Sequence, residues 1–269
     1  MSIAFRRREG VQFANIEYVQ EGMIGWLTLA RPQALNSLSI ETLAEIEAVL
    51  EGFAIVPRVL VITGKGRAFC AGADLQGVGG SLDGATGLRA FLERCQAVFA
   101  RLRAAPFPII AGLNGVTMGG GLELALSSDI VVASDAAKIG DGHANFGVIP
   151  GAGSCAILPR VVGPVIAKYL QFTGSTMSAE EMRQAGLVAR VWPAADFDAE
   201  LRALAGGIAE KSPLVLGHMK RLSNAAMDQS VETVFAQELK ANDVHVKSAD
   251  IREGMAAFAE KRKPLFRGV

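Results

Sequence analysis

The chain contains little cysteine and has no excess of charge of either sign. Its three cysteines, Cys70, Cys95 and Cys155, are widely spaced and form no Cys-x-x-Cys pair. This pattern argues against a disulfide framework and favours a reducing, cytoplasmic setting. Lysine plus arginine and aspartate plus glutamate both number 27, so the formal net charge is zero. Because a neutral chain offers no basic surface, we expect neither nucleic acid nor an anionic membrane as a partner.

Long hydrophobic runs and clustered metal ligands are also missing. No stretch approaches the roughly 18 consecutive apolar residues of a spanning helix, and no apolar run follows Arg6-Arg7-Arg8 as in a secretory signal. The three histidines, His143, His218 and His245, are too scattered to indicate a metal site. Half of the residues are hydrophobic and 20% are charged. We therefore expect a soluble protein with a sizeable core.

The order of apolar segments predicts an α/β fold. Short apolar runs at 59–62, 108–111 and 130–133 are typical of strands buried on both faces. A helical pattern covers residues 85–104 between the first two of these runs. Because strands and helices alternate over residues 55–140, we expect stacked β-α units with parallel strands.

The last third of the chain is largely helical. Ser178 and Glu181 have the spacing of a capping box, and Leu187–Val191 is a candidate last short strand. Further helical patterns follow near residues 198–210, 213–226, 231–246 and 249–260. We accordingly divide the chain into an α/β core at 1–195 and a C-terminal helical region at 196–269.

Two glycine-rich stretches follow the ends of predicted strands. They are Ala71-Gly72-Ala73-Asp74 and Gly119-Gly120-Gly121-Leu122-Glu123. Because side chains are nearly absent there, a ligand oxygen can approach the main-chain N–H groups directly. Glu123 lies three residues after Gly120, on the same helix face one turn later. The pair predicts an oxyanion site with an acid or base beside it; the alternative is close helix packing, with Glu123 stabilising a helix N-terminus.

These stretches resemble the crotonase (enoyl-CoA hydratase/isomerase) superfamily. Matching segments run in order along nearly the whole chain: Arg31–Asn36, Arg67–Leu75, Asn114–Ile130, Ile149–Gly153 and Glu253–Arg262. The resemblance implies a stack of β-β-α units, a spiral core, followed by a C-terminal helical trimerisation region. It also implies an acyl-CoA thioester substrate and a homotrimer or a hexamer made of two trimers. Coenzyme A would be part of the substrate, and no metal or further cofactor is implied.

The resemblance also assigns roles to individual residues. The main-chain N–H groups of Ala73 and Gly120 would form the oxyanion hole, and Glu123 would match the first of two catalytic glutamates. The positions expected to bind the substrate or its coenzyme A are Ala34, Ala71, Asp74, Leu75, Phe258 and Lys261. The Asp74 side chain is expected to maintain the geometry of its loop rather than to transfer a proton.

The chain departs from the hydratase pattern at the second glutamate. That position, seven residues before Pro150, is occupied by His143. Hydration is usually ascribed to two carboxylates that hold one water, so His143 is either a replacement acid or base or a residue that shapes the pocket.

Four functions therefore remain open. The leading one is a 2-enoyl-CoA hydratase of fatty-acid metabolism that stabilises a thioester enolate. A double-bond isomerase would need Glu123 alone. Retro-Claisen C–C hydrolases of the same superfamily resemble the chain around Asp141–His143, but they carry an aspartate where Ala152 stands. The fourth is an acyl-CoA-binding protein without catalytic activity.

Overall fold

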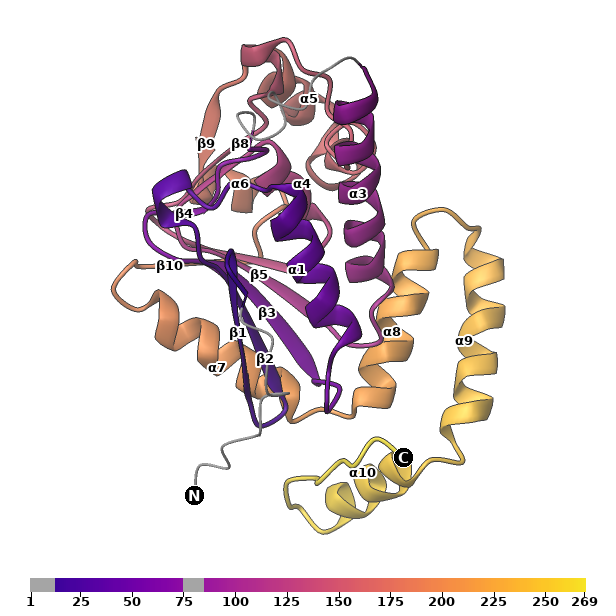
Figure 1. The fold of residues 1–269 in the computed structure, drawn as a ribbon. Helices are drawn as coiled ribbons and strands as arrows, with labels where there is room; N and C mark the ends of the chain where they lie inside the picture. Colours follow the sequence, from indigo (N-terminus) through magenta and orange to yellow (C-terminus); the bar gives the residue numbers. More distant parts are fainter. Residues whose placement is uncertain (1–12, 75–84) are drawn as a thin grey trace.

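A computed structural model describes residues 13–74 and 85–269 of the chain (Figure 1). Its larger sheet has the strand order β1-β2-β3-β5-β7-β10. These strands span, in that order, Ile16–Glu21, Ile24–Leu29, Val59–Gly64, Ile109–Leu113, Ile130–Ser134 and Arg190–Trp192. β1 and β2 form an antiparallel hairpin, and every later pair is parallel. Gly22 in the hairpin turn has φ +60°, which glycine adopts without steric cost.

A second sheet has four short strands in the order β4-β6-β8-β9. They span Ala68–Cys70, Val116–Met118, Lys138–Gly140 and Thr176–Ser178. β3, β5 and β7 of the larger sheet are each followed in the chain by a strand of the second sheet, and a helix comes next. This repetition confirms the predicted stack of β-β-α units.

The helices connect the strands and then continue to the C-terminus. Their bounds are Pro32–Ala34 (η1), Ile40–Glu51 (α1), Ala85–Ala104 (α3), Gly120–Leu126 (α4), His143–Phe146 (η2), Leu158–Thr173 (α5), Ala179–Gln184 (α6), Phe197–Ala209 (α7), Pro213–Ala225 (α8), Val231–His245 (α9) and Ala249–Ala259 (α10). The capping box predicted for α6 is present, because Ser178 and Glu181 each bind the other's main-chain N–H.

Helices cover both faces of the larger sheet (Figure 1). Leu60 of β3 belongs to the cluster that contains Phe99 of α3. Its neighbour Val61 points the other way and packs with Phe197 and Leu201 of α7. Because successive strand side chains point to opposite faces, β3 is buried on both sides. The prediction for the apolar run at 59–62 is thus confirmed.

The strand predicted at Leu187–Val191 begins later, at Arg190. The N–H groups of Leu187 and Val188 both bind the Met182 carbonyl, at 3.0 and 3.2 Å, and close the end of α6. Gly186, with φ +96°, makes this turn possible. The apolar side chains of Leu187 and Val188 are therefore buried by a helix cap rather than by a strand.

The helical end of the chain is tied to the core through a buried lysine. Lys220 of α8 has its Nζ 2.7 Å from Asp129 Oδ2, and Nζ also donates to the Leu102 and Phe107 carbonyls. Beyond α8, α9 and α10 extend away from the sheets (Figure 1). The predicted boundary between the core and the helical region, at residue 195, remains a prediction. The first helix beyond it, α7, packs on the larger sheet. Within the described ranges no helix is both long and apolar enough to cross a bilayer.

Candidate active site

The two glycine-rich loops meet beside the second sheet. The loop after β4 forms a bridge with Leu38, in which Leu38 N donates to Gly72 O and Asp74 N donates to Leu38 O, both at 2.8 Å. A parallel bridge of this kind leaves the N–H of the intervening Ala73 pointing to the other side. The loop after β6 leads into α4, where Gly120 is the first helical residue. Its N–H therefore has no partner within the helix.

The main-chain N–H groups of Ala73 and Gly120 lie next to each other. A Cβ atom placed on Gly120 would be 3.6 Å from Ala73 N, and one placed on Gly72 would be 3.7 Å from Gly120 N. Within residues 13–74 and 85–269, neither N–H donates a hydrogen bond to the protein. The structure thus brings together the two predicted donors, and their role as an oxyanion hole remains a prediction.

Glycine is required on both sides of Gly120. Gly119 has φ +50° and ψ −118°, a conformation that residues with a Cβ rarely adopt. A Cβ on Gly121 would lie 2.1 Å from the Cys70 carbonyl oxygen, which is far inside van der Waals contact. The glycines therefore allow α4 to begin directly against the loop after β4.

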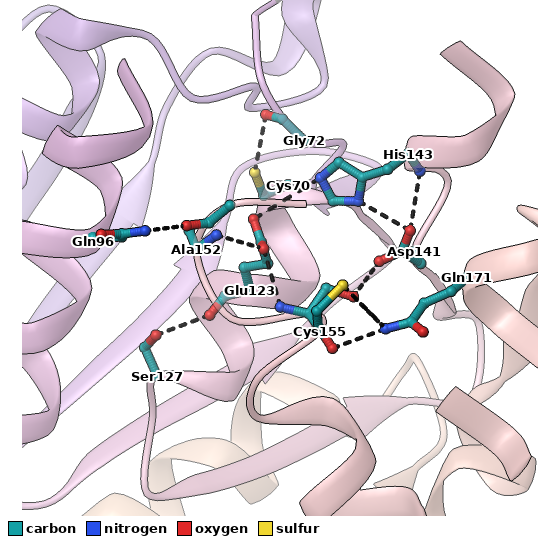
Figure 2. Close-up of polar contacts among 12 residues, drawn as sticks. Cys70, Gly72, Gln96, Glu123, Ser127, Asp141, His143, Ala152, Cys155 and Gln171 are labelled. Carbon is teal, nitrogen blue, oxygen red and sulfur yellow. Dashed lines mark hydrogen bonds and ion pairs between the residues drawn. The ribbon is translucent and has the colours of Figure 1, made fainter. Parts of the chain in front are cut away.

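Glu123 of α4 is buried, and only 2% of its surface is exposed. Its Oε1 accepts hydrogen bonds from Ala152 N at 2.8 Å and Ser154 N at 3.1 Å (Figure 2). Burial raises the pKa of Glu123, and the two N–H donors and His143 lower it by less. The carboxyl group is thus held in a fixed orientation, with a stronger affinity for a proton than an exposed glutamate has.

His143 points toward Glu123 and is paired with Asp141 (Figure 2). Asp141 Oδ1 lies 3.0 Å from His143 Nδ1 and accepts the His143 main-chain N–H at 3.1 Å. Because Nδ1 faces a carboxylate, it carries a hydrogen, and Nε2 is left 4.0 Å from Glu123 Oε2. Burial alone would lower the pKa of His143, but the hydrogen bond and charge of Asp141, aided by Glu123, raise it. The pair can therefore hold or release a proton near neutral pH.

The histidine ring also adjoins the loop that carries Gly120. A Cβ on Gly119 would be 3.5 Å from His143 Cε1 and 3.7 Å from Nε2. Two main-chain donors, a buried carboxyl group and an imidazole therefore surround one small region. This arrangement can bind a carbonyl oxygen and move protons beside it.

Comparison with known proteins shows the family of this chain. The family model described as enoyl-CoA hydratase/isomerase matches residues 20–269. The chain belongs to the enoyl-CoA hydratase/isomerase family. The resemblance to the crotonase superfamily is thereby confirmed.

Relatives and solved structures of this family match nearly the whole chain. A crotonyl-CoA hydratase of Syntrophomonas wolfei is 35% identical over 94% of this chain and 98% of that protein. An enoyl-CoA hydratase structure from Bacillus anthracis, 31% identical, superposes with a TM-score of 0.90 over 95% of this chain and all of its own. The enoyl-CoA hydratase subunit I of Geobacillus kaustophilus, at 42% identity, has a TM-score of 0.89 over 96% of this chain and 100% of that chain.

The remaining positions suggested by the family resemblance are only partly assembled. Ala34 ends η1, and the N–H of Ala71 binds the Leu35 carbonyl at 3.0 Å. The Asp74 carboxylate forms an ion pair of 2.8 Å with Arg31, as a side chain that fixes its loop would. Leu75 lies outside the described residues.

Two predicted coenzyme A contacts lie far from Glu123 in this chain. Phe258 of α10 is 86% exposed, and Lys261 follows the end of that helix with φ +54°. In Figure 1, α10 lies at the bottom of the molecule, whereas α4 lies among other helices in its upper half. One copy of the chain therefore does not bring Phe258 and Lys261 to its own Glu123–His143 pair.

Three polar residues of the site do not follow from the family motifs. They are Asp141, which binds His143; Ser154, which binds Asp141; and Gln171, which binds Ser154. The Asp-Gly-His order offers a signal for the first, because Gly142 at φ +73° turns the chain so that the carboxylate reaches the ring. No comparable signal marks Ser154 and Gln171, which are 17 residues apart. Among the described residues, no group of three or more His, Cys, Asp or Glu is arranged to hold a metal ion.

Proposed function

We propose that the chain is a 2-enoyl-CoA hydratase, which adds water across the C2=C3 double bond of an acyl-CoA thioester. The observation that carries this proposal is the pair of adjacent N–H groups at Ala73 and Gly120, next to buried Glu123 and His143. The name of the Syntrophomonas relative, crotonyl-CoA hydratase, supports the same substrate class. Coenzyme A enters as part of the substrate, and the mechanism uses no metal or redox cofactor.

The two N–H groups stabilise the charge that develops on the thioester oxygen. As the water oxygen attacks C3, the electrons of the C2=C3 double bond shift toward the thioester carbonyl. Negative charge then develops on the thioester oxygen, and an enolate forms. Two fixed main-chain donors cost no reorganisation at this moment, and one such donor is typically worth about 3 kcal/mol. The same contacts place C2 and C3 near the side chains that move protons.

Glu123 and His143 divide the proton transfers between them. The Glu123 carboxylate takes a proton from the attacking water, and Nε2 of protonated His143 gives a proton to C2. Afterwards Glu123 has gained a proton and His143 has lost one, so transfer between them restores the starting state. Their 4.0 Å separation excludes a direct hydrogen bond. It approaches the roughly 4.5 Å spanned by two hydrogen bonds of about 2.8 Å to one shared water.

A histidine can replace the second glutamate because of its partner. The Asp141 carboxylate holds the ring and raises the pKa of His143, which favours the acid form of the imidazole. The hydratase pattern is therefore changed in residue type, while an acid and a base still face the same region.

Retro-Claisen hydrolysis is a second candidate that one observation favours. Hydrolases of that branch pair their histidine with an aspartate at the position of Ala152. Here Asp141 supplies a carboxylate from a different position in the chain, 3.0 Å from His143 Nδ1. His143 could thus act as a base that activates water for attack on a carbonyl carbon.

One substrate panel separates these functions. The purified protein is assayed with 2-enoyl-CoA thioesters of graded length, with 3-enoyl-CoA thioesters and with a cyclic β-diketone. We expect 3-hydroxyacyl-CoA to form from a 2-enoyl-CoA. Conversion of 3-enoyl to 2-enoyl thioester alone would identify an isomerase, and C–C cleavage of the diketone would identify a hydrolase. Binding of thioesters without any turnover would leave only an acyl-CoA-binding protein.

We also propose that the protein assembles as a trimer or as a pair of trimers. Val231, Phe235 and Leu239 follow one another at helical spacing on α9 and are 62%, 60% and 69% exposed. Such an apolar row needs a covering surface. In an assembly, Phe258 and Lys261 could reach coenzyme A bound to a neighbouring copy. Light scattering on the full chain should give three or six times the monomer mass, and a monomer would refute this proposal.

A further inference from the structure

Ser154 contacts Glu123 of the proposed acid–base pair and also Asp141, which binds His143, the other member of the pair. It is fully buried, and its main-chain N–H donates to Glu123 Oε1 at 3.1 Å. Its hydroxyl donates a hydrogen bond to Asp141 Oδ2. Asp141 in turn holds His143 through its other oxygen, Oδ1. A single residue therefore connects the carboxyl group of Glu123 to the imidazole of His143.

Gln171 of α5 holds Ser154 in place. Its Nε2 donates to the Ser154 carbonyl oxygen at 3.0 Å and lies 3.4 Å from Ser154 Oγ. The polar groups of Ser154 are thus all engaged, and the residue has little freedom to rotate. This matters because a loosely held serine could not fix the position of two other side chains.

The hydrogen bonds among Ser154, Asp141 and His143 do not form the triad that a serine nucleophile needs. In a Ser-His-Asp triad the serine hydroxyl donates to the histidine, and the aspartate binds the far side of the ring. Here Asp141 Oδ1 accepts the main-chain N–H and the ring Nδ1–H of His143. The Ser154 hydroxyl donates to the other carboxylate oxygen, Oδ2. The hydroxyl faces the carboxylate and not the imidazole. Its effect is therefore on the aspartate that holds the histidine.

This hydrogen bond controls how strongly Asp141 attracts the proton of His143. Burial favours the neutral form of Asp141, but hydrogen bonds from His143 and Ser154 outweigh it and lower the pKa of Asp141. Removal of the hydroxyl would leave one buried oxygen without a donor and increase the affinity of the pair for a proton. The other groups around Asp141 and His143 are the Glu123 carboxyl of α4, the Cys155 thiol, which interacts with Asp141 and Glu123, and the neutral Gln171 amide of α5, which binds Ser154.

We propose that Ser154 is a positioning residue: its N–H holds Glu123 and its hydroxyl holds Asp141, and together they keep His143 Nε2 opposite Glu123 Oε2. This role rests on the proposed function, in which Glu123 and His143 exchange protons with the substrate. It adds a residue that touches neither the thioester nor the reacting water. Ser154 instead acts through the two side chains that do.

The test uses Ser154→Ala in the full-length protein. This change removes the hydroxyl and keeps the N–H bond to Glu123. The titration of His143 is followed by NMR on protein labelled with ¹³C-histidine, with the signal assigned from a His143→Gln sample. We expect its midpoint to move to higher pH. In turnover assays the basic limb of the pH profile moves the same way, while the acidic limb stays in place. At neutral pH, kcat falls on the order of 10- to 100-fold, as for loss of a hydrogen bond to a charged group.

Two further variants keep the test decisive. Ser127→Ala is the matched control, because Ser127 is also buried and its hydroxyl contacts neither Asp141 nor the Glu123 carboxyl group: it donates to the main-chain oxygen of Glu123 at 2.9 Å and accepts from Arg103 at 3.3 Å. It should leave both limbs and the NMR midpoint unchanged. Ser154→Cys keeps a similar volume but has a weaker donor, so it should shift the midpoint in the same direction. It takes the place of Ser154→Ala in the test if that variant does not fold.

An unchanged His143 midpoint in both Ser154 variants would overturn this role, even if their melting temperature or kcat fell. The NMR titration needs no substrate, so it separates this inference from the proposed function. If wild type converts no enoyl-CoA yet the midpoint moves, the coupling stands and the hydratase assignment fails.

Discussion

Replacement of Glu123 by glutamine should remove proton transfer while keeping the site intact. The side-chain oxygen of the glutamine can still accept the N–H groups of Ala152 and Ser154, which lie 2.8 and 3.1 Å from Oε1 of the native glutamate. What is lost is the base that takes a proton from water. General acid–base catalysis contributes about 10²–10⁴-fold, so kcat should fall by this factor, or about 3–5 kcal/mol of activation free energy. KM should change little, because the main-chain N–H groups of Ala73 and Gly120, which we propose bind the thioester oxygen, are unchanged.

The same substitution should not weaken the fold. Since the folded-state pKa of Glu123 is raised, the neutral form is favoured, and the stability that this brings is lost as pH rises through the folded pKa. Glutamine does not titrate. The melting temperature of Glu123→Gln should therefore equal that of wild type at low pH, exceed it as the pH rises through the folded pKa of Glu123, and keep a constant margin above that pH.

The assay is steady-state turnover of the best 2-enoyl-CoA substrate, together with thermal unfolding over a pH series. Glu45→Gln is a matched control, since Glu45 of α1 also accepts main-chain N–H groups, from Ala14, Asn15 and Ile16. It should leave kcat unchanged. If Glu123→Gln retained kcat within a few-fold of wild type, Glu123 would not be the base. A melting temperature lowered at every pH would show that the carboxylate is needed for folding.

Other predictions concern the pH profile, the glycine loop and the buried lysine. The plot of kcat/KM against pH should be bell-shaped, because Glu123 must be ionised and His143 protonated. The acidic limb should lie above 4.5 and the basic limb above 6.5, which are the ordinary pKa values of glutamate and histidine. An acidic limb at or below 4.5 would contradict the raised pKa of Glu123. Gly121→Ala should cost about 3 kcal/mol in unfolding free energy, because its Cβ would meet the Cys70 carbonyl oxygen at 2.1 Å; a wild-type denaturation midpoint would refute this. Lys220→Met should cost about 1–3 kcal/mol, because the Leu102 and Phe107 carbonyl oxygens lose a buried donor and Asp129 loses its ion-pair partner; denaturant unfolding near wild type would show that these contacts are dispensable.

Much of the fold could be predicted because its signals are local. The apolar run at 59–62 is short and continuous, as a strand covered on both faces must be, and α7 and α3 do cover it. Helix ends were also predictable within a residue or two where Ser or Pro begins the helix, as at Ser212-Pro213 and Ser230. Leu187–Val191 was less predictable, because burial by a helix cap and burial by a strand leave the same apolar pattern.

The candidate site was predictable only in part, for a related reason. Gly120 and Glu123 lie on one helix turn, so their spacing alone places them together. The bond between Ser154 and Asp141 joins two loops 13 residues apart, and it depends on how α5 packs against η2. Such contacts arise from tertiary packing and leave no fixed spacing in the sequence.

A crystal structure with a bound saturated acyl-CoA, which cannot be hydrated, would examine the paired amides themselves. The thioester oxygen should lie about 2.7–3.1 Å from the main-chain nitrogens of both Ala73 and Gly120, with C2 and C3 facing Glu123 and His143. A thioester oxygen bound elsewhere, with these two N–H groups turned apart or bonded to protein atoms, would show that the chain does not stabilise an enolate in this way.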